Sequence, residues 1–64
     1  MQEKNIAVEN GDYIIVSYRE NGEAKQVDGK VEANTPAFIK LRTSAGRECH
    51  IPIRDIINTT SVQM

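Results

Sequence analysis

The sequence predicts a single all-β domain, a small and strongly bent five-stranded barrel with a 3-10 turn before its last strand. Its apolar residues include eight Ile and five Val but only one Leu, and β-branched side chains favour pleated sheets over helices. Short segments of alternating apolar and polar residues are separated by Gly, Pro and Asn, which is typical of strands joined by tight turns. A chain of 64 residues has room for one small core. We expect an N-terminal extension at 1–12, the barrel at 13–60 and a tail at 61–64.

The first half of the barrel is predicted as a hairpin with a bent second strand. Residues 13–19 are rich in β-branched and aromatic side chains and form the first strand. Asn21 and Gly22 tolerate a positive φ, as tight hairpin turns require. The second strand runs over 24–33, and Gly29 within it indicates a sharp bend.

The second half is predicted as two short strands, a 3-10 turn and a last strand. Residues 38–43 form the third strand and 47–51 the fourth. Pro52 has no amide hydrogen and interrupts pairing, so that a single 3-10 turn fits residues 52–55. Residues 56–60 then form the fifth strand.

The alternation of apolar residues also predicts which side chains fill the core. These are Ile14, Val16, Tyr18, Val27, Val31, Ile39, Leu41, Cys49, Ile51, Ile53 and Ile56. Cys49 is expected to be an inert core thiol. His50 has the opposite parity and is expected to be solvated.

The order of these elements, with a glycine in the bent second strand ahead of an apolar third strand, resembles that of the Sm-like family. That family includes the Sm proteins and the bacterial RNA chaperone Hfq. The segments that carry the resemblance are Asn21-Gly22, Gly29-Lys30-Val31-Glu32, Phe38-Ile39-Lys40-Leu41 and Ile51-Pro52-Ile53-Arg54-Asp55-Ile56-Ile57. The resemblance implies a small barrel, a ring of subunits and RNA binding. The positions of the Lys-His pair in Hfq hold Ile51, Pro52 and Ile53 here, and Arg54 is the one cation among them.

A second, partial resemblance is to the C-terminal part of the YolD-like proteins of Gram-positive bacteria and their phages. It rests on Ile15-Val16-Ser17-Tyr18, Asn21-Gly22, Gly29-Lys30-Val31 and Ile51-Pro52-Ile53-Arg54-Asp55-Ile56. This resemblance implies a β-rich fold more than a function.

The residue types offer no site for catalysis, a cofactor or a metal. The chain has one Cys and one His, which excludes an intrachain disulfide and the usual zinc site. There is no Gly-rich phosphate loop, and a small barrel has no room for a substrate cavity. With no apolar run of the ~18 residues that a membrane helix needs and no export signal at its start, the chain is expected in the cytoplasm without membrane contact.

The charges are unevenly distributed along the chain. The net charge is −1, which excludes a uniformly basic nucleic-acid binder. Residues 1–36 carry four basic and seven acidic groups, whereas 37–64 carry four basic and two acidic groups. The candidate binding residues are Lys40, Arg42, Arg47 and Arg54, with Phe38 placed to stack on a base. They form either a basic strip for RNA or an acidic protein surface, or an ordinary solvated face.

Three apolar residues remain once the core face is filled, namely Tyr13, Ile15 and Ile57. They either cover the ends of the barrel or form a subunit interface. The leading hypothesis is a non-enzymatic interaction module, a bacterial or phage accessory factor that binds a protein partner or itself. The alternative is a ring of Sm-like subunits that binds single-stranded RNA through the basic strip.

Overall fold

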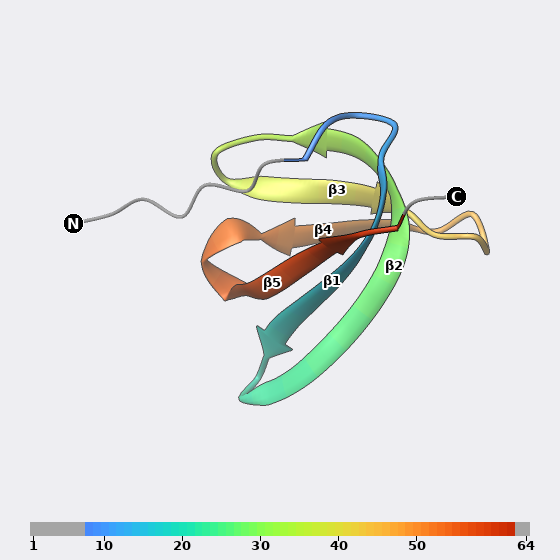
Figure 1. Ribbon diagram of the computed structural model, residues 1–64. Helices are drawn as coiled ribbons and strands as arrows, with labels where there is room; N and C mark the ends of the chain where they lie inside the picture. The colour runs from blue at the N-terminus through green and yellow to red at the C-terminus, as the bar shows by residue number, and fades with distance from the viewer. Residues whose placement is uncertain (1–7, 63–64) are drawn as a thin grey trace.

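The computed structural model of the chain describes residues 8–62, which form one antiparallel five-stranded sheet (Figure 1). The elements are β1 (Tyr13–Glu20), β2 (Glu23–Asn34), β3 (Phe38–Arg42), β4 (Glu48–Pro52), the 3-10 turn η1 (Ile53–Asp55) and β5 (Ile56–Ser61). The predicted all-β fold, with five strands and a 3-10 turn before the last one, is confirmed. Each predicted strand boundary lies within one residue of the observed one.

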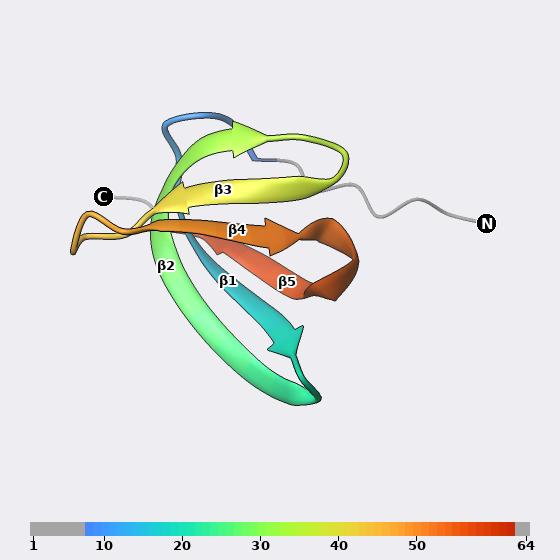
Figure 2. The same ribbon diagram turned by 180° about the vertical axis from the view of Figure 1, so that it is seen from behind.

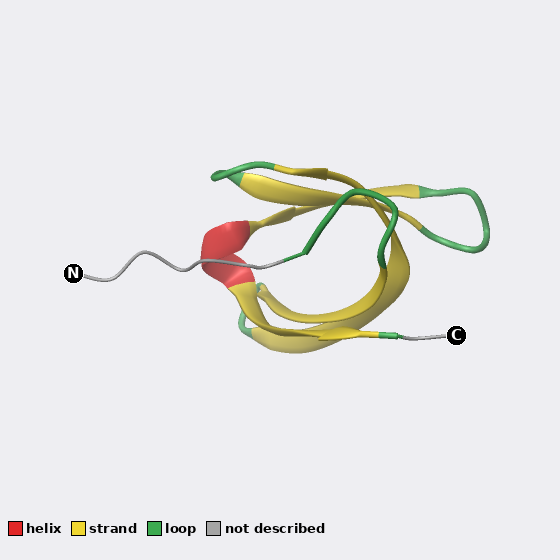
Figure 3. Ribbon diagram, turned by 45° about the horizontal axis from the view of Figure 1, so that its top comes forward, coloured by secondary structure: helices red, strands yellow, loops and turns green. Residues whose placement is uncertain are grey.

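The sheet curls strongly but does not close. Its strand order is β4-β3-β2-β1-β5, so β4 and β5 are the two edges, and η1 connects them (Figures 2 and 3). No hydrogen-bonded pairing joins the two edge strands. The word barrel therefore applies only loosely, and both edges keep unpaired backbone groups.

The predicted hairpin turn between β1 and β2 is confirmed. Asn21 and Gly22 have φ values of 52° and 80°, and they join the paired residues Glu20 and Glu23. Two consecutive residues at positive φ match the right-handed twist of the flanking strands, which explains why Asn-Gly is found here.

The bend of β2 has two causes, of which the sequence indicated one. A Cβ atom on Gly29 would lie 2.7 Å from the carbonyl oxygen of Arg42, so the glycine lets the end of β3 approach the backbone of β2. Just beyond it, the pairing with β3 skips Glu32 between Val31 and Ala33. Such a bulge bends a strand and increases its twist, and together these features fold the second half of β2 away from the first.

The core lies on the inner, concave face of the sheet. Its buried side chains are Val8, Ile14, Val16, Val31, Ile39, Leu41, Ile51, Ile53 and Ile56, with Tyr18, Val27 and Cys49 packed against them. All of the predicted core residues are in this set. Val8 was not predicted, because it lies in the stretch expected to be an extension.

Residues 8–12, the N-terminal strap, are tied to the second half of β2. Gly11 donates its N–H to the carbonyl of Val31 and Val31 donates to the carbonyl of Asp12, both at 2.8 Å. The side-chain amide of Asn34 donates to the carbonyl of Val8 at 3.0 Å. Part of the predicted extension is thus built into the fold, whereas residues 1–7 and 63–64 lie outside the described residues.

Candidate functional site

The predicted basic residues lie on three different elements. Lys40 and Arg42 share the outer face of β3, where they pair with His50 and Glu48 of β4. The sequence allowed either Arg47 or His50 as the cross-strand neighbour of this pair, and the structure assigns His50. Arg47 lies instead in the turn between β3 and β4.

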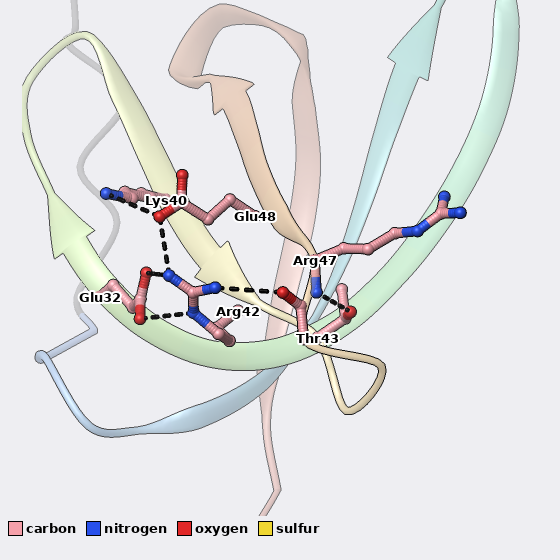
Figure 4. A network of polar contacts seen from close by, with 7 residues as sticks. Glu32, Lys40, Arg42, Thr43, Arg47 and Glu48 are labelled. Carbon is pink, nitrogen blue, oxygen red and sulfur yellow. Dashed lines mark hydrogen bonds and ion pairs between the residues drawn. The ribbon is translucent and has the colours of Figure 1, made fainter.

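Arg42 is held between two carboxylates (Figure 4). Its Nε and Nη2 atoms donate to the two oxygens of Glu32 at 2.8 and 3.3 Å, and Nη2 also donates to Glu48 at 2.7 Å. Its Nη1 atom donates to the carbonyl of Gly46 at 3.1 Å. The guanidinium therefore has little freedom to reach an external ligand.

The bulge in β2 places Glu32 in this contact. Because β2 has an extra residue at this point, Glu32 stands opposite β3 without a backbone partner, and its carboxylate meets the guanidinium in a paired geometry. Hydrogen bonds from Arg42 lower the pKa of Glu32 below its ordinary value. The same bonds raise the pKa of Arg42.

Lys40 completes a charge-balanced network. Its Nζ atom lies 3.3 Å from the carboxylate of Glu48. Two cations and two carboxylates, Lys40, Arg42, Glu32 and Glu48, thus offset each other on this outer face. The sequence interpreted both acids as solvated, because it could not show which strand residues lie opposite one another.

Arg47 and Arg54 lie at the two ends of β4, one in the preceding turn and one in η1. Both are exposed, and neither side chain has an ion-pair partner among residues 8–62. Figure 4 shows the Arg47 side chain pointing away from Arg42. The four predicted cations do not form one continuous strip.

Phe38 is half-buried at the start of β3. Its ring meets the imidazole of His50 edge to face, with 5.3 Å between the ring centroids. The turn ahead of it is fixed by Thr35, whose hydroxyl accepts the N–H of Phe38 at 3.0 Å. One aromatic surface of Phe38 is thus already in contact with His50.

Two of the predicted interface residues lie on the outer face of β1. Tyr13 and Ile15 are both half-buried, and Ile15 stands between Asp28 of β2 and Thr60 of β5. The hydroxyl of Tyr13 donates to the carboxylate of Asp28. This hydrogen bond, together with desolvation and the negative charge of Asp28, raises the pKa of Tyr13 above its ordinary value.

The third predicted interface residue lies on the β5 edge. Ser17 pairs with Asn58 and Tyr18 with Ile56, so Ile57 between them has no cross-strand partner. Its side chain is 50% exposed, the one large apolar side chain that the described part of the chain exposes to this extent. Nothing in the sequence signalled this second bulge.

A shallow groove separates the β4 edge from the end of β1. It is lined by Tyr18, Arg19, Glu20, Cys49, His50, Ile51, Pro52 and Asp55. Cys49 is half-buried against the core, as expected, and His50 is exposed. Within residues 8–62, no three His, Cys, Asp or Glu side chains are grouped closely enough to hold a metal ion.

The comparisons with known proteins give one family. The profile of the family described as "Mechanosensitive ion channel, beta-domain" matches residues 3–62. Searches of curated proteins and of solved structures give no match. Between residues 8 and 62, the chain forms no helix long and apolar enough to cross a membrane.

The family match corrects several expectations. The resemblances to the Sm-like and YolD-like families are wrong, and the expected phage accessory role and RNA binding are withdrawn with them. The glycine that carried the Sm-like resemblance is explained by the close approach of two strands at Gly29, which any small curved sheet can require. The expected cytoplasmic location is also wrong, because the matched family is a domain of a membrane channel. The family is a channel domain and not an enzyme.

Proposed function

The chain belongs to the mechanosensitive ion channel β-domain family, and we propose that it is a non-enzymatic assembly domain of such a channel. In this role, copies of the domain associate with one another through the two free edges of the sheet. The observation that carries the proposal is the contrast between these edges.

The β5 edge has the properties of an association surface. Its residues, Ile56–Ser61, include no charged side chain, although charges and prolines are the usual protection of a free edge. Val62 donates its N–H to the carbonyl of Tyr13. By alternation along an antiparallel pair, the backbone groups of Thr59 and Ser61 point outward. Exposed Ile57 adds apolar surface to this edge.

The β4 edge is shorter and differs chemically. Thr43 donates its N–H to the carbonyl of Arg47 at 2.9 Å, so the same alternation leaves the backbone groups of Glu48 and His50 pointing away from β3. Pro52 ends the strand and offers no N–H to a further strand. This edge can therefore accept only a short added strand.

Unlike edges favour association of β4 of one copy with β5 of the next. Such a contact is head to tail, so it leaves one free edge on each terminal copy and closes only as a ring. Strand addition of this kind supplies backbone hydrogen bonds, and side chains such as Ile57 supply the apolar contact. An oligomer larger than a dimer is the expected product.

Sedimentation velocity of the 64-residue chain over a range of concentrations tests the proposal. We expect association that Ile57→Lys weakens strongly, because a lysine on a free edge opposes strand addition. Ala45→Lys is the matched control, since Ala45 is exposed in the turn between β3 and β4 and adds the same charge away from the β5 edge.

Two results would contradict the proposal. A chain that stays monomeric at every concentration lacks the association altogether. Equal weakening by Ile57→Lys and Ala45→Lys would show that added charge, and not the β5 edge, is responsible.

A further inference from the structure

His50 occupies a particular position on the β4 edge. Its backbone N–H and carbonyl point away from β3, toward the side on which a further strand would add. Its imidazole is held by the edge-to-face contact with Phe38, and His50 lines the groove beside this edge. A histidine is the side chain that ordinarily changes its charge between pH 5 and 8.

We infer that His50 makes the association of copies pH-dependent, so that the copies separate as the pH falls from 7.5 to 6. This inference rests on the proposed function, because it concerns the same contact between β4 and β5. It adds a regulating group to that contact, which neither the fold nor the family supplies.

On its own face of the sheet, a protonated His50 meets no free negative charge. Its cross-strand partner is Lys40, which carries the same charge and lies close in such a pair. The carboxylate of Glu48, two residues away on β4, is already shared by Lys40 at 3.3 Å and Arg42 at 2.7 Å. Protonation therefore adds an excess positive charge to a balanced network.

Across the groove, the charged groups are Arg19 and Glu20 of β1 and Asp55 of η1. Glu20 is paired with Lys25 at 2.8 Å. Asp55 has no ion-pair partner among residues 8–62, so in a separate chain it is the carboxylate that can attract a charged His50.

A neighbouring β5 laid along β4 would remove this compensation. It would lie on the groove side of His50, between the imidazole and Asp55, and it would bring no charge of its own, because Ile56–Ser61 are uncharged. The protonated ring would also lose water on that side. The proton is therefore bound more tightly by the separate chain, and by linkage acid favours separation.

Sedimentation velocity at pH 7.5 and pH 6.0 tests the inference on the full chain and on His50→Gln. For each His50 proton taken up on separation, the dissociation constant of one contact rises by at most tenfold per pH unit. We expect a several-fold rise for the wild-type chain and no change for His50→Gln. Far-ultraviolet circular dichroism at both pH values checks that the sheet is retained.

The outcomes separate the inference from the proposed function. Wild-type chain that associates equally at both pH values overturns the role of His50 but leaves the assembly intact. The same acid sensitivity in His50→Gln also overturns it, because another group must then titrate. A chain that is monomeric already at pH 7.5 overturns the assembly, and the inference with it.

Discussion

The two halves of the curved sheet use their outer faces differently. In the half formed by β3, β4 and the end of β2, the outer polar groups bind each other, with Arg42 held by Glu32 and Glu48. In the half formed by β1 and β5, the outer residues include Tyr13, Ile15 and the exposed Ile57, which is 50% accessible. The first half resembles a finished protein surface, whereas the second offers apolar groups and free backbone.

This difference teaches where a partner can bind. Charged residues drew attention in the sequence, but a charge that is already paired within the chain has little left to offer a ligand. Unpaired edge groups and exposed apolar side chains are a better guide. The predictions below test the junction between the halves, then the strap, and finally one polar contact from each half.

The largest effect is expected at Gly29, where the two halves meet. Gly29→Ala already places a Cβ atom 2.7 Å from the carbonyl oxygen of Arg42, and Gly29→Val adds two methyl groups. We expect losses of about 3 kcal/mol or more in the free energy of unfolding for the valine variant. This is comparable to the whole stability of a domain of this size. Urea denaturation measures the loss.

Gln26→Val is the control for Gly29, because it introduces the same β-branched residue at an exposed position of β2. It should leave stability nearly unchanged. If Gly29→Ala and Gln26→Val were equally stable, the backbones of β2 and β3 could not lie as close as described.

The N-terminal strap should contribute a smaller amount. Val8 is buried with 9% of its surface exposed, and Val8→Ala removes two methyl-sized groups from the core. At roughly 0.8 kcal/mol per buried CH₂, we expect a loss of about 1 to 2 kcal/mol, measured by urea denaturation. A loss near zero would mean that residues 8–12 are an appendage, as the sequence suggested, and not part of the fold.

The strands were predictable because their signals are local. β-branched segments, the Asn21-Gly22 turn and Pro52 each determine structure within a few residues, and each was found within one residue of its predicted place. The core followed from the alternation of apolar residues. Val8 was missed because a single apolar residue in an irregular segment has no periodicity to reveal it.

The candidate site was less predictable because it depends on register. The bulges at Glu32 and Ile57 shift which residues face each other, and each shift comes from the curvature of the whole sheet. Without them, Arg42 could be assigned neither to Glu32 nor to Glu48. The family was likewise beyond reach, because a glycine, a turn and an apolar strand fit many small curved sheets.

Glu32→Gln tests the half in which polar groups bind each other. Because Arg42 lowers the pKa of Glu32 in the folded chain, the charged carboxylate stabilises the fold at neutral pH, and this contribution disappears as the pH falls through the lowered pKa. We expect the variant to be slightly less stable than wild type at pH 7, with the gap closing below about pH 4. Thermal unfolding across this range, repeated in 1 M salt, measures it. A gap that is independent of pH would exclude the ionic contact as its cause.

The smallest effect is expected from Tyr13→Phe in the other half, where the lost contact is an exposed hydrogen bond to Asp28. The raised pKa of Tyr13 in the folded chain means that its contribution is complete below pH 10 and disappears as the pH rises through the raised pKa. The variant should therefore be slightly less stable than wild type at pH 8 and should match it at strongly alkaline pH. Because Lys25 titrates in both proteins, its effect cancels in the difference. If Tyr13 serves assembly only through its apolar ring, the phenylalanine variant should still associate like wild type in sedimentation. Loss of association would instead mean that the hydroxyl itself contributes to the contact between copies.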